Sequence, residues 1–254
     1  MNQVRTALIL FGAPGSGKGT QAQRLTTCLH APHIATGDIL RQHIQLGDQL
    51  GREVESVLKA GLLVTDDLVN KLVEERLDRE DAQGAIILDG YPRTAPQAGA
   101  MLRMFEARKI APVVVHLKVD YNRIIKRLSG RRVCPVCGTL YSTVSSGGSH
   151  PPKIEGICDL DGARLITRPD DNPAVIRRRL EEYDMQTKPL VEYFQSRGVP
   201  YHELDGGDGA PEVISERICA LVRPELGKPE LGKPGLVEPV AAKSGVKPVS
   251  AAAR

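Results

Sequence analysis

A glycine-rich stretch near the start of the chain constrains the fold more than any other feature. Residues Gly12-Ala-Pro-Gly-Ser-Gly-Lys-Gly-Thr20 directly follow the apolar run Ala7–Phe11. The run is typical of a buried strand, and the glycines leave backbone N–H groups free to converge on an anion where the next helix begins. We therefore expect a phosphate-binding loop between a strand and a helix, with Lys18 reaching the phosphates.

The loop departs from the common pattern at one position. The pattern G-x-x-x-x-G-K-[ST] fits through Lys18, but Gly19 stands where a Ser or Thr hydroxyl would contact Mg²⁺. Asp89 follows a second apolar run, Ala85–Leu88, and ligands bind at the carboxyl ends of the strands in an open α/β sheet. The sequence therefore predicts that Asp89 orients the waters of Mg²⁺ in place of the missing hydroxyl. The alternative is that Asp89 caps the turn that follows it.

Apolar runs alternate with helical patterns over most of the chain. Further strands are expected at 33–35, 112–119 and 199–204, and helices at 21–30, 65–77, 95–108, 121–128, from 173 onward and at 210–222. This alternation predicts an α/β fold with a doubly wound parallel sheet. Two short helical segments, starting at Thr36 and near Leu50, exceed what one crossover between parallel strands needs. We therefore expect an inserted subdomain at 35–64.

The five cysteines divide into two groups. Cys134-x-x-Cys137 and Cys158-x-x-Asp161 have the spacing of two metal-binding knuckles, which predicts a structural tetrahedral Zn²⁺ site. Asp159 and His150 are alternatives to Asp161 as the fourth ligand. Cys28 and Cys219 lie in helical patterns and are expected to pack as small apolar residues. An odd number of cysteines, three of them clustered, indicates metal ligands or free thiols in a reducing compartment and not a disulfide framework.

Composition excludes several partner classes. A net charge of +3, from 34 basic and 31 acidic residues, is too balanced to predict nucleic acid as the main partner. No stretch approaches the roughly 20 apolar residues of a membrane helix, so we expect a cytoplasmic protein without a membrane partner. Residues 224–254 are rich in Pro, Gly, Lys and Ala, and this composition predicts a disordered tail.

Six stretches resemble the adenylate kinase family, in particular its members with a long lid. They are Gly12–Thr20, Thr36–Arg41, Leu63–Asp66, Leu88–Arg93, Gly130–Val133 and Arg168–Asp171. The resemblance covers residues 5 to about 222 in order. It implies a monomer that transfers the terminal phosphoryl group of MgATP reversibly to AMP, giving two ADP, and so serves adenine nucleotide homeostasis. It also implies a P-loop core of residues 1–34, 65–130 and 172–223, a helical AMP-binding subdomain at 35–64 and a zinc-binding lid at 131–171.

The resemblance implies a role for each matching residue. ATP would contact Gly15, Ser16, Gly17, Lys18, Gly19, Thr20, Arg131, Leu140, Tyr141 and the main chain of Asp208. AMP would contact Thr36, Arg41, Leu62, Leu63, Val64, Gly90, Tyr91, Pro92, Arg93, Gln97, Arg168 and Arg179. The catalytic cations would be Lys18, Arg93, Arg127, Arg131, Arg168 and Arg179, with Asp38 and Asp89 holding Mg²⁺ through water and with Cys134, Cys137, Cys158 and Asp161 holding Zn²⁺.

The chemistry of phosphoryl transfer agrees with this assignment. The reaction needs mainly in-line positioning and cations for the spread negative charge, so no Ser, His or Cys nucleophile is expected. Three departures from the family pattern are a longer lid, through a hairpin tip at 145–148, Asp208, where only the main-chain role carries over, and the tail after Arg223. Two alternatives stay open at this point: a kinase that acts on UMP, CMP or GMP, and a nucleic-acid or protein-binding module built on the knuckles.

Overall fold

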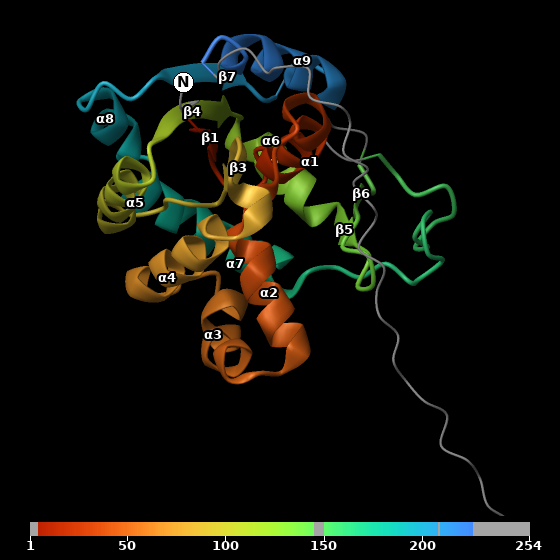
Figure 1. The fold of residues 1–254 in the computed structure, drawn as a ribbon. Coiled ribbons are helices and arrows are strands. Elements are labelled where there is room, and N and C mark those ends of the chain that lie inside the picture. Colours follow the sequence, from red (N-terminus) through yellow and green to blue (C-terminus); the bar gives the residue numbers. More distant parts are fainter. Residues whose placement is uncertain (1–4, 145–149, 208, 226–254) are drawn as a thin grey trace, which may run out of the picture.

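A parallel β-sheet forms the central layer of the protein (Figure 1). The computed structural model describes residues 5–144, 150–207 and 209–225, and within them the sheet has five strands in the order β2-β3-β1-β4-β7. The strands are β1 (Arg5–Phe11), β2 (His33–Ala35), β3 (Ile86–Asp89), β4 (Ile110–Lys118) and β7 (Tyr201–Asp205). Because every neighbouring pair is parallel, all five carboxyl ends lie along one edge. The α/β prediction is confirmed.

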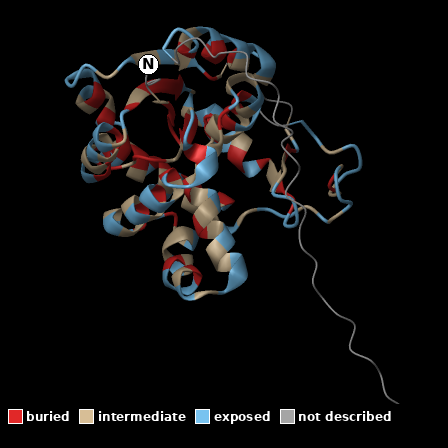
Figure 2. Cartoon of the chain, viewed as in Figure 1, coloured by how far each residue is buried: buried red, intermediate tan, exposed pale blue. Residues whose placement is uncertain are grey.

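Helices cover both faces of the sheet, as expected for a doubly wound fold. Alternate residues of β1 enter separate cores, with Ile9 and Phe11 in one and Leu8 and Leu10 in the other. On the second face lie α1 (Lys18–Leu29) and α9 (Pro211–Val222). On the first lie α4 (Asp66–Leu77), α5 (Ala95–Ala107), α6 (Tyr121–Ser129), α7 (Pro173–Glu182) and α8 (Leu190–Gln195). Figure 2 shows the buried residues gathered at the sheet between these layers.

Capping residues explain where several of these helices begin. Asp120 accepts hydrogen bonds from two backbone N–H groups at the start of α6. Asn172 accepts one from Ala174 N at the start of α7, where Pro173 takes the first helical position. Both starts were predicted. The helix after Pro173 then widens into a π-helical turn, η3 (Tyr183–Thr187), before α8. The last strand begins at Tyr201, after Pro200, which has no N–H for the sheet.

Two short helices stand apart from the sheet, between β2 and α4. They are α2 (Thr36–Leu46) and α3 (Gln49–Lys59), which pack against each other below the core in Figure 1. Their close approach depends on Gly51, where an added methyl group would lie 2.1 Å from the carbonyl oxygen of His43. Asp48 caps α3 by accepting from Gly51 N. The two helices predicted for 35–64 are therefore present.

The described part of residues 131–171 contains little regular structure. It holds β5 (Arg131–Val133) and β6 (Leu140–Ser142), which pair antiparallel, and the 3₁₀ turn η2 (Pro169–Asp171); another such turn, η1 (Glu80–Ala82), precedes β3. Val133 also pairs with Ile166. The predicted hairpin tip at 145–148 and most of the predicted disordered tail lie outside the described residues. No helix in the described ranges is both long and apolar enough to cross a bilayer.

The structure corrects the expectation for two cysteines. Cys28 of α1 and Cys219 of α9 form a disulfide across a sequence separation of 191 residues. Both had been expected to pack as thiols. The pairing follows from the fold, because α1 and α9 lie side by side on one face of the sheet, where Gln21 Nε2 also donates to the carbonyl oxygen of Pro211. Nothing in the local sequence around either cysteine indicates that these helices are neighbours.

Candidate functional site

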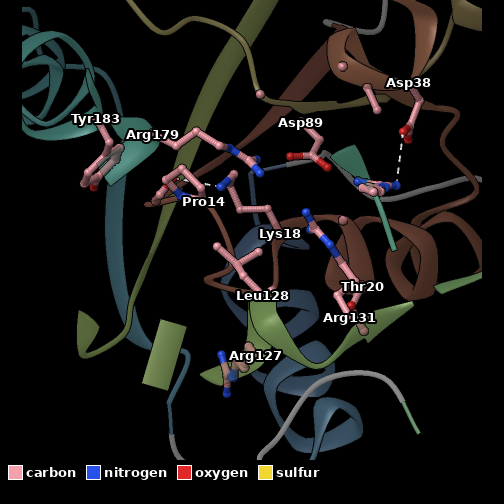
Figure 3. A pocket seen from close by; sticks show the side chains of 18 of the residues that line it. Pro14, Lys18, Thr20, Asp38, Asp89, Arg127, Leu128, Arg131, Arg179 and Tyr183 are labelled. Carbon is pink, nitrogen blue, oxygen red and sulfur yellow. Dashed lines mark hydrogen bonds and ion pairs between the residues drawn. The ribbon is translucent and has the colours of Figure 1, made fainter. Parts of the chain in front are cut away.

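A cavity of about 200 Å³ lies at the carboxyl edge of the sheet (Figure 3). Most residues that the resemblance selected line it: Gly15, Gly17, Lys18, Gly19, Thr20, Asp38, Arg41, Leu63, Asp89, Gly90, Pro92, Arg93, Arg127, Arg131, Leu140, Tyr141, Arg168 and Arg179. Six others do not line it: Ser16, Thr36, Val64, Tyr91 and Gln97, which are buried, and Leu62, which is exposed. Asp208 is outside the described residues. Segments far apart in sequence thus meet because each follows or approaches a strand end.

Lys18 lies at the centre of the cavity, at the start of α1. Its Nζ donates to the carbonyl oxygens of Gly12, at 2.8 Å, and Ala13, at 2.9 Å. Burial, together with the positive charges of nearby arginines such as Arg93 and Arg179, lowers the pKa of Lys18 to about 8, although Asp89 partly opposes this. The amine is therefore held on its own loop in surroundings already rich in positive charge.

Asp89 lies where the departure at Gly19 predicted a compensating group. A methyl group added at Gly19 would come within 3.3 Å of Asp89 Oδ2, so the carboxylate borders the space that a side chain at 19 would enter. Thr94, and not Asp89, caps the next helix, α5, so the capping alternative does not hold. Burial raises the pKa of Asp89, but the His33 hydrogen bond and the charge of Lys18 outweigh it and bring the pKa below the usual range. Asp89 is therefore an anion next to the loop.

His33 is a contact of this carboxylate that the sequence reasoning did not include. Its Nε2 lies 3.4 Å from Asp89 Oδ2. The contact arises from the parallel pairing of β2 with β3, in which Ala35 is opposite Asp89. A histidine two residues before the end of a three-residue strand carries no local signal of this neighbour.

Half-buried arginines surround the rest of the cavity. Burial, followed by the charges of neighbouring arginines, lowers the pKa of Arg168 to about 10, and burial likewise lowers the pKa of Arg179 to about 10. Arg93 is also half-buried, and the loss of solvent around it likewise lowers its pKa. Within the described residues, Arg168 Nε is buried without a hydrogen-bond partner. The cavity thus holds positive charge that the protein itself only partly neutralises.

Three aspartates supply that partial neutralisation. Arg179 Nη1 lies 2.9 Å from Asp170 Oδ2, and Arg131 Nε donates to Asp171 Oδ2 at 2.7 Å. Asp38 pairs with Arg41 at 2.5 Å and lies 3.7 Å from Arg168. Asp170 and Asp171 belong to a stretch that carries the family resemblance, yet no role had been assigned to them. They hold two of the arginines in place across a turn.

Arg127 occupies a different position from the other arginines. In Figure 3 its guanidinium lies apart from the group formed by Lys18, Asp89 and Arg179. It donates to the carbonyl oxygen of Gly206 at 3.0 Å and approaches that of Ser16 at 3.5 Å. Burial lowers its pKa. Arg127 therefore borders the outer side of the glycine-rich loop.

The polar residues expected near the second nucleotide make contacts among themselves. Gln97 is 2 % exposed; its Oε1 accepts from Arg93 N at 2.8 Å and its Nε2 donates to Asp66 Oδ1 at 2.8 Å. Thr36 Oγ1 donates to the carbonyl oxygen of Gly90 at 3.0 Å. Tyr91 Oη donates to Asn70 Oδ1 at 2.7 Å. Two of these side chains, Gln97 and Thr36, hydrogen-bond the backbone of Arg93 and Gly90 and so fix the segment that carries Arg93.

A cysteine cluster forms a second site, in residues 131–171. One ligand atom from each of Cys134, Cys137, Cys158 and Asp161 lies within 4.8 Å of the others. The Cys137 and Cys158 sulfurs are 3.6 Å apart, and Cys134 Sγ is 3.2 Å from Asp161 Oδ2. Tetrahedral Zn²⁺ with Zn–S bonds of about 2.3 Å places two sulfurs about 3.7 Å apart, so the donor set and spacing fit zinc.

The alternative fourth ligands lie outside this cluster. Asp159 Oδ1 accepts from Lys153 N at 2.8 Å, and the exposed His150 has Nδ1 3.2 Å from the carbonyl oxygen of Pro151. Tyr141 links the two sites, because it lines the cavity while its Oη lies 3.4 Å from Cys158 Sγ. The described residues thus group Asp161 with the three cysteines.

Comparison with known proteins places this geometry in a family. A family model described as adenylate kinase matches residues 10–199. A curated adenylate kinase from Caldanaerobacter subterraneus is 40% identical over 210 residues, which cover 82% of this chain and 93% of that relative. One from Anaeromyxobacter sp. (strain K) is 42% identical over 225 residues, covering 87% and 99%. One from Thermosipho africanus is 42% identical over 189 residues, covering 74% and 86%.

Proposed function

The chain belongs to the adenylate kinase family, whose reaction is phosphoryl transfer between ATP and AMP, and we propose that its cavity binds the two nucleotides for that transfer. One observation carries the assignment of the site. Lys18, Arg93, Arg168 and Arg179, all half-buried, converge on the edge of the glycine-rich loop, and desolvation and mutual repulsion lower their pKa values. Two polyphosphate chains supply the negative charge that such a set of cations lacks.

The donor and acceptor phosphates would be held by different parts of the cavity. The backbone N–H groups of residues 15–20 bind the ATP phosphates, and Lys18 exchanges its carbonyl partners for oxygens of the transferred group. Arg168, whose Nε is buried without a hydrogen-bond partner among the described residues, and Arg179 would bind phosphate oxygens from the opposite side. Donor and acceptor would thereby be aligned, and once both are bound the developing charge would meet cations that are already in place.

The residues present fit a Mg²⁺ ion bound with ATP. The carboxylate of Asp89 borders Gly19 and is ionised, and carboxylates that hold Mg²⁺ through water are common in phosphoryl-transfer sites. When bound, the ion neutralises phosphate charge. Asp89 would orient its waters, with Asp38 as the second carboxylate, although Asp38 is paired with Arg41 in this structure.

The two inserted segments are proposed to close over the nucleotides. Residues 35–64 contribute Arg41 and Leu63 to the cavity, and residues 131–171 contribute Arg131, Tyr141 and Arg168. Closure would bring these groups onto the phosphates and exclude water, which would otherwise accept the phosphoryl group. The cysteine cluster would hold Zn²⁺ as a structural ion in the second segment, because four protein ligands leave no open position for chemistry.

The nucleotide specificity can be tested by steady-state rates with AMP, CMP, UMP and GMP as acceptors for MgATP. We expect kcat/KM to be highest for AMP, at least about tenfold above the others, as a difference of about 1.4 kcal/mol in transition-state binding would give. A higher value for another monophosphate would refute AMP as the substrate. Phosphoryl transfer to none of them would refute the function.

The nucleic-acid alternative and the monomeric state are tested separately. The cations described above line the cavity, so the proposed function requires neither a second copy of the chain nor a nucleic acid. We expect one monomeric species in light scattering and no retention of labelled RNA or DNA by the full chain at about 0.15 M salt. Nucleic-acid binding that persists at that salt concentration would support the alternative of a nucleic-acid-binding module built on the cysteine knuckles.

ATP binding is expected to take up a proton at alkaline pH. With its pKa lowered to about 8, Lys18 is mostly neutral at pH 9 in the free protein. Bound phosphates raise that pKa, so the complex binds more protons than the free protein, and affinity falls as the pH rises above 8. Uptake should be about 0.9 proton at pH 9. Calorimetric titration in two buffers of different ionisation enthalpy measures it, and the Lys18→Met protein should lose most of the uptake. Equal uptake by both proteins would contradict the assignment.

A further inference from the structure

A buried polar cluster lies beside the phosphate cavity, and the chemistry proposed above does not use it. It consists of His116 on β4, Tyr183 on η3 and Tyr201 on β7. His116 Nδ1 lies 2.6 Å from Tyr201 Oη, and His116 Nε2 lies 3.1 Å from Tyr183 Oη. In the sheet His116 is opposite Phe11, the last residue before the glycine-rich loop, and the two rings meet edge-on with centroids 5.1 Å apart.

The charge states of this cluster follow from its burial. Burial lowers the pKa of His116 to about 4, so the ring is neutral at pH 7 and has one donor and one acceptor nitrogen. Burial also raises the pKa of Tyr183, and burial followed by the charge of Glu203 raises the pKa of Tyr201 to about 12. Both hydroxyls are therefore protonated at pH 7, and each lies within hydrogen-bond distance of one ring nitrogen of His116.

Tyr183 begins the π-helical turn η3, where the chain passes along the cavity. Its carbonyl oxygen accepts from Lys188 N at 2.8 Å, which is the wide hydrogen bond of such a turn. Upstream, Tyr183 N–H bonds the carbonyl oxygen of Arg179, which lies one helical turn earlier on the same face. Downstream, Thr187 Oγ1 donates to the carbonyl oxygen of Arg93 at 2.8 Å. The turn therefore contacts the backbone of two arginines of the cavity.

We propose that Tyr183, held by His116, is a positioning residue that fixes Arg179 and Arg93 through the turn η3. The proposal rests on the proposed function, because it assumes that these two arginines bind phosphate. Asp170 holds the guanidinium end of Arg179, at 2.9 Å. The helix end has to be held as well, since neighbouring cations repel the side chain until phosphate binds. The His116 hydrogen bond ties that end to a central strand of the sheet. Figure 3 shows Tyr183 and Arg179 side by side at one wall of the pocket.

The test compares two substitutions, each of which removes a tyrosine hydroxyl that contacts His116. Tyr183→Phe removes the bond to the turn, and Tyr201→Phe removes the bond to β7, which carries none of the cations. In an ADP-formation assay we expect Tyr183→Phe to lower kcat about tenfold, because a small misplacement of a catalytic group lowers the chemical step strongly. KM for ATP should stay within about twofold, because neither arginine is assigned to ATP, and Tyr201→Phe should keep kcat within about twofold.

A double-mutant cycle separates positioning from general stability. In an Arg179→Lys background, Tyr183→Phe should lower kcat less than about threefold further, since the group that it positions is already replaced. A second pair tests the other contact: Thr187→Val should lower kcat, and Thr187→Ser, which keeps the hydroxyl, should restore it. Equal kcat for Tyr183→Phe and Tyr201→Phe, or a full tenfold loss in the Arg179→Lys background, would overturn the proposal. A wild-type protein that forms no ADP would instead overturn the proposed function.

Discussion

Replacing Lys18 by Met should lower kcat by about 10³-fold while the protein stays folded. Lys18 is the first residue of α1, and the proposed task of its amine is to follow the charge of the transferred group. Loss of a preorganised donor of this kind typically lowers the rate by about 10²–10³-fold, or about 3–4 kcal/mol. Met has a similar length and no charge, so packing is kept and the loss is electrostatic. The measurement is ADP formation under saturating ATP and AMP.

The stability of the same variant provides an independent check. Below about pH 8 the folded protein has to keep a buried ammonium charged, and the lowered pKa of Lys18 means that folding disfavours that proton. Removing it should leave Tm at pH 7 equal to or above that of the wild type. Lys71→Met, on the exposed side of α4, is the matched control and should change neither kcat nor Tm. A Lys18→Met protein with more than a tenth of wild-type kcat would contradict the assignment of Lys18.

Removing the proposed zinc should lower thermal stability far more than it lowers the rate. Replacing Cys134 and Cys137 together by Ser should abolish metal binding and lower Tm by about 5–15 °C, because a structural metal that binds only the folded state adds its binding energy to folding. At room temperature kcat should stay within about threefold, since the cluster lies outside the phosphate cavity. Thermal melts and elemental analysis of the purified protein make the measurement.

Two aspartates in the same turn provide the control for the metal site. Asp161→Asn changes a proposed ligand and should weaken metal retention under a chelator, whereas Asp159→Asn keeps the oxygen that accepts from Lys153 N and should not. Equal metal retention by both variants would exclude Asp161 as a ligand. A wild-type protein that contains no stoichiometric metal and melts at the same temperature as the Cys134→Ser/Cys137→Ser protein would refute the zinc site altogether.

Local signals in the sequence predicted most of the fold. Apolar runs marked the strands of the central sheet, and capping residues such as Asp120 and Asn172 marked helix starts, because these signals depend only on the next few residues. The disulfide between Cys28 and Cys219 was missed for the complementary reason. The disulfide requires that two helices be neighbours although the cysteines are 191 residues apart, and no local pattern in either helix predicts that contact.

The candidate site divides in the same way. The glycine spacing and Lys18 mark an anion-binding loop without any tertiary information, and the missing hydroxyl at Gly19 led to Asp89, which the structure places beside it. His33 and Tyr183 were not found. Their side chains matter only through partners on other strands or helices, Asp89 in one case and His116 in the other.

The sequence by itself determined that this chain builds a phosphate-binding loop on a parallel sheet. It also identified the cysteine knuckles and the family, because each of these features is a short motif with a fixed spacing of residues. Only the tertiary structure decided which charges face each other: that Asp170 and Asp171 hold Arg179 and Arg131, that Gln97 supports Arg93 from behind, and that His116 ties the turn after Arg179 to the sheet. Electrostatic and hydrogen-bond energies depend on distances of a few ångströms and on burial, and strand order and helix packing set both after the chain has folded.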